Sequence, residues 1–306
     1  MSAEWMAISK ALADATEKAA AYTVAVHGEA RGSSSGVIWR AGLVVTAEHA
    51  LRRDEEIEVT LPDGKVASAK LQGRDPSTDL ALLRCENAKS APRAFADTRE
   101  LKPGQLMLVV GRTRVSGPVA SLGVVSLVAQ ERRLWGGGAI APYVRLDVAL
   151  QHIAVGGAVL GAAGDVVGIA TPKFSPGGAL TVPVATVNRV VDALLAKGHI
   201  PRGYLGVGLQ TIRLPESLRE TLGRPEKAAA MVLEVEPGGP ASNAGVMIGD
   251  ILLSVEGKPV VRLEDVHAHL HGEQIGKALR AEFLRGGVKR EMQMQIAERP
   301  NPESTR

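Results

Sequence analysis

The chain has 306 residues, of which 45% are hydrophobic, and it contains 34 Gly and 17 Pro. This length and composition are typical of a globular protein with more than one domain. The net charge of +3 comes from scattered Lys and Arg, which argues against a nucleic-acid partner. Cys85 is the single cysteine, so no disulfide can form within the chain.

The first residues bear on the cellular compartment. Residues 1–19 carry Glu, Lys and Asp where a signal peptide needs an unbroken apolar run, and no long charge-free apolar run occurs elsewhere. We therefore expect no membrane span and a cytoplasmic location for the chain as given, or a periplasmic one if an export signal was removed. Trp5, Met6, Ile8 and Leu12 predict a helix that either packs on its own domain or joins an oligomer.

Short apolar runs bounded by Gly, Pro or Asp follow one another up to about residue 185. Such an alternation of strand and turn signals indicates an all-β barrel or sandwich. The runs are residues 22–28, 35–51, 57–73, 80–85, 106–111, 119–130 and 143–150. Aromatic residues make up only 3%, so the core must consist of Val, Leu, Ala and Ile.

A helical pattern then occupies residues 184–198, with Thr186 as the expected N-cap and Gly198 as the stop. Its apolar face is formed by Val187, Val190, Val191, Leu194 and Leu195. A second β-rich unit with short helices follows. The predicted division is a helical segment at 1–19, a first domain at 20–198, a second domain at 199–298 and a disordered tail at 299–306.

Several motifs carry a resemblance to a known family. "VVTAEHAL", which contains His49, is similar to the histidine strand of chymotrypsin-fold serine proteases. "GRDPSTDLALLR", which contains Asp79, and the segment at 145–171 resemble the HtrA (Deg) subgroup. The resemblance covers residues 20–298 and implies a chymotrypsin-like double β-barrel followed by a PDZ domain, which is an α+β unit.

At the nucleophile segment the chain departs from that family. The family pattern is Gly-Asn-Ser-Gly-Gly-Pro, whereas residues 153–158 read IAVGGA. His49 and Asp79 retain two triad positions, but Val155 replaces the nucleophilic serine and has no hydroxyl to attack a substrate. Ile153 takes the place of an oxyanion-hole glycine whose positive φ a β-branched residue disfavours. We therefore expect a pseudoprotease, a serine protease homologue that is not an enzyme.

Other residues could supply different chemistry. Ser116 or Ser126 could act as a substitute nucleophile, and His152 could join His49 and Asp79 in a metal site. We expect neither, because nothing in the sequence places them together, and we predict no metal and no cofactor. The segment at 32–36, GSSSG, is interpreted as a turn and not as a phosphate loop, because no GK[ST] follows.

The second domain resembles a circularly permuted bacterial PDZ domain. Residues 202–207, RGYLGV, resemble its carboxylate-binding loop, and residues 236–260 match the PDZ segment that HtrA proteins share. The resemblance implies that backbone N–H groups bind the carboxylate of a peptide C-terminus, beside an apolar pocket. The expected peptide-binding residues are Tyr204, Leu205, Gly206, Val207, Val266 and Leu270.

The expected function is peptide or protein C-terminus binding by a bacterial quality-control protein, as a scaffold, adaptor or chaperone-like partner. The alternatives are a serine endopeptidase with residual or unconventional activity and a regulatory subunit of an active HtrA paralogue. The resemblance also implies a homotrimer, and no nucleic-acid partner is expected.

Overall fold

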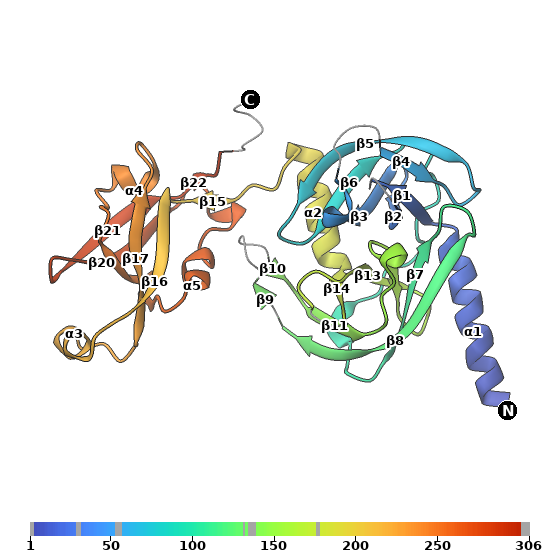
Figure 1. Ribbon diagram of the computed structural model, residues 1–306, viewed down its shortest axis with the longest axis horizontal. Helices are drawn as coiled ribbons and strands as arrows, with labels where there is room; N and C mark the ends of the chain where they lie inside the picture. The colour runs from blue at the N-terminus through green and yellow to red at the C-terminus, as the bar shows by residue number, and fades with distance from the viewer. Residues whose placement is uncertain are drawn as a thin grey trace. The chain divides into compact units, whose positions relative to one another are not determined.

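The structure is a computed structural model that describes residues 3–28, 32–52, 57–130, 132–133, 139–175 and 178–300. Two units, coloured from blue to yellow and from yellow to red in Figure 1, adjoin in sequence at residues 200 and 201. The predicted tail lies outside the described residues after Pro300.

The first unit opens with helix α1 (Ala3–Ala20) and a closed barrel of six antiparallel strands. Neighbours around this barrel run β1-β2-β3-β6-β5-β4. Its strands are β1 (Thr23–His27), β2 (Ser34–Arg40), β3 (Leu43–Ala47), β4 (Ile57–Thr60), β5 (Val66–Asp75) and β6 (Leu80–Arg84). Each of the apolar runs predicted in this part of the sequence contributes at least one strand.

A second closed barrel of six strands follows, in the order β11-β14-β13-β12-β7-β8. Its strands are β7 (Leu106–Arg112), β8 (Pro118–Ala129), β11 (Tyr143–Asp147), β12 (Ala158–Leu160), β13 (Val166–Thr171) and β14 (Ala179–Pro183). The short strands β9 (Arg132–Arg133) and β10 (Ala139–Ile140) pair with each other. Short 3-10 turns η1 (Glu48–Ala50), η2 (Thr98–Glu100) and η3 (His152–Ala154) join the strands.

Both barrels are filled by aliphatic side chains, in keeping with the low aromatic content. Helix α2 (Val184–Lys197) adds its apolar face to this core and ends at Gly198, which adopts the left-handed conformation. These two features were predicted correctly. The predicted cap was wrong, because the helix begins two residues before Thr186, directly after Pro183, and Thr186 is buried within its first turn.

Helix α1 packs only its C-terminal half on the barrels, against β1, β7 and β8. Leu12 and Ala15 contact the core and Ala19 is fully buried. Trp5 is 66% exposed and Met6 and Ile8 are exposed as well, so the first turns of the helix carry an uncovered apolar face. Figure 1 shows the N-terminal part of α1 extending away from the barrels.

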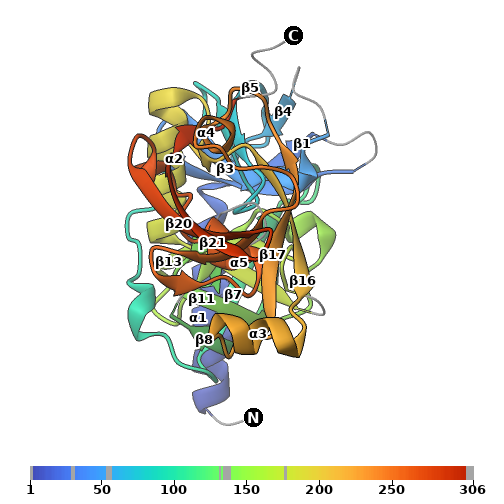
Figure 2. The ribbon, with the colours of Figure 1, turned by 90° about the vertical axis from the view of Figure 1, so that its left-hand side faces the viewer.

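The second unit is built on an antiparallel sheet in the order β16-β17-β18-β20-β21. Its paired strands β16 and β17 lie side by side in Figure 2. Its strands are β15 (Gly203–Tyr204), β16 (Val207–Arg213), β17 (Ala228–Val235), β18 (Ile251–Val255), β19 (Lys258–Pro259), β20 (Ala278–Arg285), β21 (Val288–Gln295) and β22 (Ala297–Glu298). Helices α3 (Glu216–Leu222), α4 (Pro240–Asn243) and α5 (Leu263–His267) and the 3-10 turn η4 (Gly272–Gln274) connect them. The predicted all-β double barrel followed by a PDZ-like unit is confirmed.

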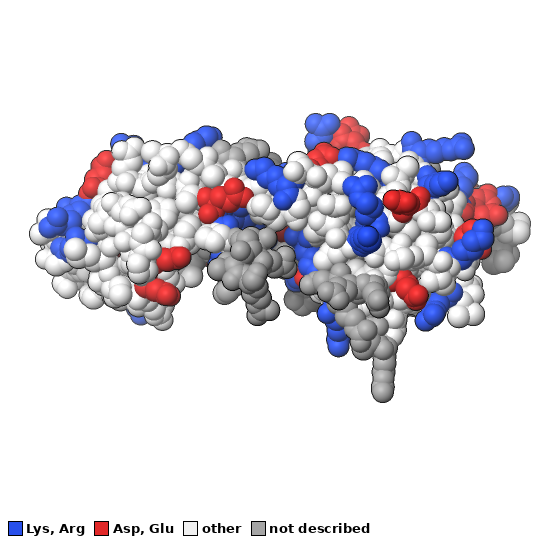
Figure 3. Space-filling model, turned by 90° about the horizontal axis from the view of Figure 1, so that it is seen from above, with Lys and Arg blue, Asp and Glu red and all other residues white. Residues whose placement is uncertain are grey.

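Charged side chains are interspersed on the surface. On the face drawn in Figure 3, Lys and Arg alternate with Asp and Glu. Exposed ion pairs such as Lys10–Asp14 and Arg40–Asp192 belong to this mixture. On this face the small net charge is therefore spread out and does not form one basic surface.

Candidate functional site

Two places in the molecule gather chemically capable groups, one in the barrels and one in the second unit. In the barrels, His49 lies in the turn η1 that follows β3, and Asp79 lies in the turn between β5 and β6. The Asp79 turn is held by Asp75, whose carboxylate accepts hydrogen bonds from the Ser77 N–H and the Ser77 and Thr78 hydroxyls. The DPST sequence therefore fixes the position of Asp79 through side-chain to backbone contacts.

Asp79 and His49 form a close pair. The two Asp79 oxygens lie 2.9 and 2.8 Å from His49 Nδ1, and Oδ1 also accepts the His49 backbone N–H at 3.0 Å. Asp79 is fully buried and adopts a left-handed φ of 58°, which Asp tolerates better than most residues. This arrangement places the ring proton on Nδ1 and leaves the Nε2 lone pair available to act as a base.

Charged neighbours surround the pair. Lys173 Nζ lies 3.6 Å from Asp79 Oδ1 and 3.3 Å from Glu48 Oε2, and the Thr171 hydroxyl donates to Asp79. The hydrogen bond with Asp79 raises the pKa of His49, while burial and the Lys173 charge oppose that shift. The imidazolium form of His49 is thus stabilised by its carboxylate partner.

Residue 155 lies against the turn that carries His49. Val155 is buried and packs on Ala47 and Ala50, which flank or end that turn. Its N–H donates to the His152 carbonyl at 3.1 Å, and its carbonyl accepts the Ser35 N–H at 2.8 Å. The structure thus brings His49, Asp79 and Val155 into one region, as their motifs predict, and the amide of Val155 is bonded within its own loop.

The neighbouring loop residues are also fixed by local bonds. Ile153 lies in the turn η3 and is not among the residues with a left-handed φ, as its β-branched side chain predicts. Its carbonyl accepts the Ser35 hydroxyl at 2.5 Å. Gly156 has a φ of 80°, and a Cβ there would lie 2.3 Å from the Ser35 carbonyl oxygen. Glycine is therefore required at 156.

The alternative chemistries gain no support from the described residues. Ser116 lies in the turn after β7 and Ser126 lies on β8, where its hydroxyl donates to the Arg145 carbonyl. Among the described residues, no group of three or more His, Cys, Asp or Glu side chains is arranged to hold a metal ion. Nor does this part of the chain contain a helix long and apolar enough to cross a membrane.

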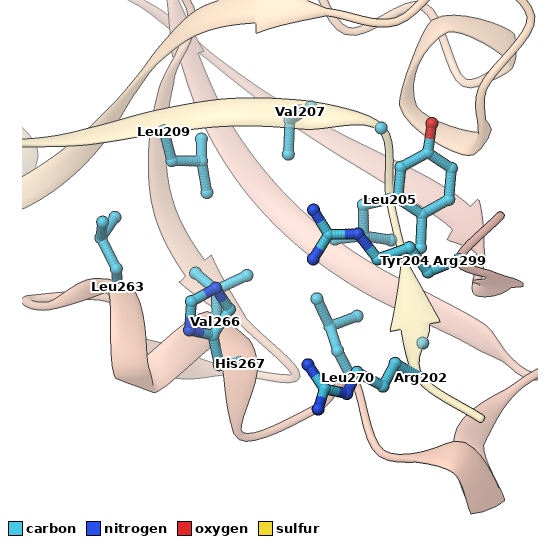
Figure 4. A pocket seen from close by; sticks show the side chains of 12 residues that line it. Arg202, Tyr204, Leu205, Val207, Leu209, Leu263, Val266, His267, Leu270 and Arg299 are labelled. Atoms are coloured by element: carbon cyan, nitrogen blue, oxygen red, sulfur yellow. The ribbon is translucent and has the colours of Figure 1, made fainter. Parts of the chain in front are cut away.

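The second unit carries a groove between β16 and α5 (Figure 4). Its volume is about 230 Å³. All six residues that the sequence predicts for peptide binding line it, and the structure adds further members. The complete lining is Arg202, Gly203, Tyr204, Leu205, Gly206, Val207, Leu209, Leu263, Val266, His267, Leu270 and Arg299.

The loop at the end of the groove is held from behind. The Leu205 and Gly206 carbonyls accept the N–H groups of Ala241 at 2.9 Å and Glu236 at 2.8 Å, and the Tyr204 hydroxyl donates to the Glu236 carboxylate. Gly206 has a φ of 73°. Within the described part of the chain, the N–H groups of Leu205 and Gly206 donate to no acceptor. Two adjacent unpaired N–H donors of this kind are able to bind an anion.

Sequence reasoning missed several lining residues. The spacing of Leu263, Val266, His267 and Leu270 is that of one helical face, so it could have identified all four and not only two. Arg299 falls in the segment predicted to be a disordered tail. Its N–H donates to the Arg202 carbonyl at 2.8 Å, and no pattern in the sequence predicts this contact.

Comparisons with known proteins agree with this division. Residues 34–169 match the family described as trypsin-like peptidase domain, and residues 203–296 match the PDZ domain. A "Probable periplasmic serine endoprotease DegP-like" of Pseudomonas putida (strain GB-1) is 30% identical over 282 residues, which are 90% of this chain and 58% of that protein. A protein of the same name from Brucella suis biovar 1 (strain 1330) is 32% identical over 275 residues, which are 88% of this chain and 53% of that protein.

Solved structures match the chain along nearly its whole length. "HtrA-type protease AlgW with decapeptide" has a TM-score of 0.75 at 25% identity and covers 95% of this chain and 99% of its own. The serine endoprotease from Yersinia pestis has a TM-score of 0.72 at 26% identity, with 94% and 98% covered. The chain spans little more than half the length of the curated relatives it matches.

These relatives correct one expectation. The prediction that the chain is not an enzyme is wrong, because the similar proteins are named serine endoproteases and nothing in the described structure shows that the active site is lost. They also leave the cytoplasmic expectation without support, since the curated relatives are named periplasmic.

Proposed function

We propose that the chain, which joins a trypsin-like peptidase domain to a PDZ domain and resembles the HtrA/DegP family, uses its PDZ groove to bind peptides or protein C-termini that end in an apolar residue with a free carboxylate. In this proposal the chain acts as a scaffold, adaptor or chaperone-like partner of the proteins it captures, in the periplasm that its relatives' names indicate.

The observation that carries the proposal is the pair of open donors at Leu205 and Gly206. A terminal carboxylate would accept both N–H groups, and hydrogen bonds to an ionised acceptor are about twice as strong as neutral ones. The loop is already held in place by Glu236 and Ala241, so little conformational freedom is lost when the ligand binds.

The groove beside the loop suits an apolar last residue. Leu205 and Val266 are buried at its floor, and Leu270 borders it from the segment after α5 (Figure 4). A peptide that extends along β16 would add a strand to the edge of the sheet, since β16 is the first strand in its order. The backbone would then supply affinity and the pocket would supply specificity.

A titration of the full chain with fluorescent peptides tests the proposal. A peptide with an apolar C-terminus should bind at about 1 µM, or about −8 kcal/mol. Its C-terminally amidated form should bind far more weakly, because the open donors lose their charged acceptor. Leu270→Ser should weaken binding of the free-acid peptide. Equal binding of the two peptide forms, or binding that Leu270→Ser leaves unchanged, would place the ligand elsewhere.

The His49–Asp79 pair favours serine endopeptidase chemistry as a second candidate function. The pair has the geometry of a general base with its orienting carboxylate. Valine offers no lone pair, so hydrolysis would need a nucleophile other than residue 155. Hydrolysis of casein or a peptide ester that disappears in His49→Ala supports this function, and hydrolysis unaffected by His49→Ala counts against it.

A further inference from the structure

The PDZ groove carries more positive charge than a terminal carboxylate requires. Its lining includes two guanidinium groups, Arg202 and Arg299, and the imidazole of His267, and it includes no Asp or Glu side chain. The terminal carboxylate already has two backbone N–H donors in the loop at Leu205 and Gly206. The charge of Arg299 is therefore left for another group of the ligand.

Arg299 is held at the groove by the strand pair β15–β22. In this ladder Gly203 lies opposite Glu298 and Tyr204 lies opposite Ala297, so Arg299 continues β22 beside the start of the binding loop. The Arg299 N–H donates to the Arg202 carbonyl at 2.8 Å. Figure 4 shows its guanidinium reaching over the groove, between Val207 above and Leu270 below in that view.

The Arg299 guanidinium has no carboxylate partner among the described residues. Arg285 of the same unit, in contrast, pairs with both Asp250 oxygens at 2.7 Å. Burial lowers the pKa of His267; the charge of Glu264 opposes that shift, and the charge of Arg299 adds to it, so the Arg299 guanidinium lies close enough to act on the groove. Arg299 thus contributes an unneutralised cation where a ligand would lie.

We propose that Arg299 makes the groove selective for acidic C-termini, which are peptides with an apolar last residue and an Asp or Glu among the three residues before it. This inference rests on the proposed function of the groove and names its ligand class. A guanidinium presents paired N–H groups that match the two oxygens of a carboxylate side chain. Because Arg299 is exposed, the gain is that of a rim ion pair, about two- to fivefold in affinity.

The test is a double-mutant cycle, in which two forms of the protein are each titrated with pairs of peptides that differ at one residue. The full chain and Arg299→Gln are each titrated with peptides that carry Asp or Asn at each of the three positions before a constant apolar end. In the unchanged chain we expect the Asp peptide to bind about two to five times more tightly than the Asn peptide at one of these positions. In Arg299→Gln this ratio should fall to about one while the Asn peptide binds as before.

Two further variants serve as controls. Arg213→Gln removes an equal charge from the exposed end of β16, outside the groove lining, and should keep the Asp preference. Arg299→Lys retains the charge without the paired donors and should keep part of it. Added salt should reduce the preference, because the pair is exposed.

The possible results distinguish the role of Arg299 from the binding of C-terminal peptides itself. An Asp to Asn ratio near one in the unchanged chain, or a ratio that Arg299→Gln leaves intact, overturns the role of Arg299 but leaves C-terminal binding standing. Uniform weakening of every peptide by Arg299→Gln also overturns it, because Arg299 would then hold the terminal carboxylate itself. Absence of binding by any free-acid peptide overturns the proposed function together with this inference.

Discussion

The barrel site and the PDZ groove differ in the groups that carry their chemistry, which are side chains in the barrel site and backbone N–H groups in the groove. Around His49 every capable group is a side chain: an imidazole, a carboxylate and the ammonium of Lys173. At the end of the groove the donors are backbone N–H groups of Leu205 and Gly206. A single substitution can remove a side-chain group, whereas a backbone donor persists as long as φ and ψ are kept. The first site is thus defined by residue identity and the second by loop conformation.

The largest effect is expected from variants at residues 153 and 155, which test whether side-chain identity alone defines the barrel site. Val155→Ser supplies a hydroxyl beside the His49 turn, but the amide at 155 stays bonded to the His152 carbonyl. Adding Ile153→Gly allows the loop to turn its N–H groups toward a developing oxyanion. We expect the double variant to hydrolyse a peptide ester about a hundredfold faster than Val155→Ser.

The control for that comparison is His49→Ala in the double variant, which should abolish the gain. Equal rates in the single and double variants would show that the conformation of the 153–156 loop does not limit the reaction.

The next largest effect is expected from Gly206→Val, which tests whether the conformation of the binding loop determines peptide binding in the groove. Gly206→Val should weaken peptide binding about 30- to 100-fold, since it displaces both open donors. A Cβ at 206 would lie 3.1 Å from the Tyr204 hydroxyl oxygen, and the φ of 73° disfavours valine. Gly257→Val is the matched control, because Gly257 has the same φ with nothing within 4 Å of its Cβ. Peptide titration and thermal unfolding of both variants give the answer, and equal loss of binding in both would contradict the prediction.

A smaller effect is expected from Asp79→Asn, which tests how Asp79 changes the pKa of His49. The pKa of His49 should lie above its ordinary value of 6.5 in the intact chain and fall in Asp79→Asn, because the hydrogen bond to the ionised carboxylate is lost. NMR titration measures this shift, and the His27 resonance is an internal control, because burial lowers the pKa of His27 independently of Asp79.

The raised pKa of His49 also sets a pH dependence of stability. A group whose pKa is higher in the folded state stabilises the fold fully below its unfolded value of 6.5, and this contribution is lost as the pH rises through the folded value. The free energy of unfolding should therefore fall from pH 6 to pH 8 more in the intact chain than in His49→Ala. A His49 midpoint at or below 6.5 would contradict both statements.

The smallest effect concerns assembly, which neither site requires. We predict a homotrimer in which the exposed face of α1 takes part, because Trp5, Met6 and Ile8 are left uncovered by the barrels. Replacing these three residues with serine should lower the mass measured by light scattering threefold. Lys10→Ser on the same helix should not change it. A monomeric parent protein would remove the trimer.

Much of this architecture follows from local patterns. Short apolar runs bounded by Gly, Pro or Asp predict the strands, and the spacing from Val187 to Leu194 predicts the buried face of α2. The start of that helix was misplaced because Thr186 has the chemistry of a cap, while burial in the barrel core decides its position. Tertiary packing therefore overrides a local capping preference here.

The candidate sites were predictable to different degrees. The positions of His49 and Asp79 follow from motifs whose turns are built locally, as the Asp75 contacts show. Arg299 was not predictable, because its place depends on pairing with a strand nearly a hundred residues earlier in the chain. Long-range pairing of two-residue strands leaves no periodic signal in a sequence.

Glu236 makes two hydrogen bonds to the binding loop, and these bonds affect the rate at which a ligand dissociates. Its N–H binds the Gly206 carbonyl and its carboxylate receives the Tyr204 hydroxyl, so one residue restrains two points of the loop. The entropy of ordering these donors is therefore spent when the protein folds and not when a ligand arrives. A change at residue 236 would transfer that cost to each binding event, which shortens the lifetime of the complex without touching a single ligand contact.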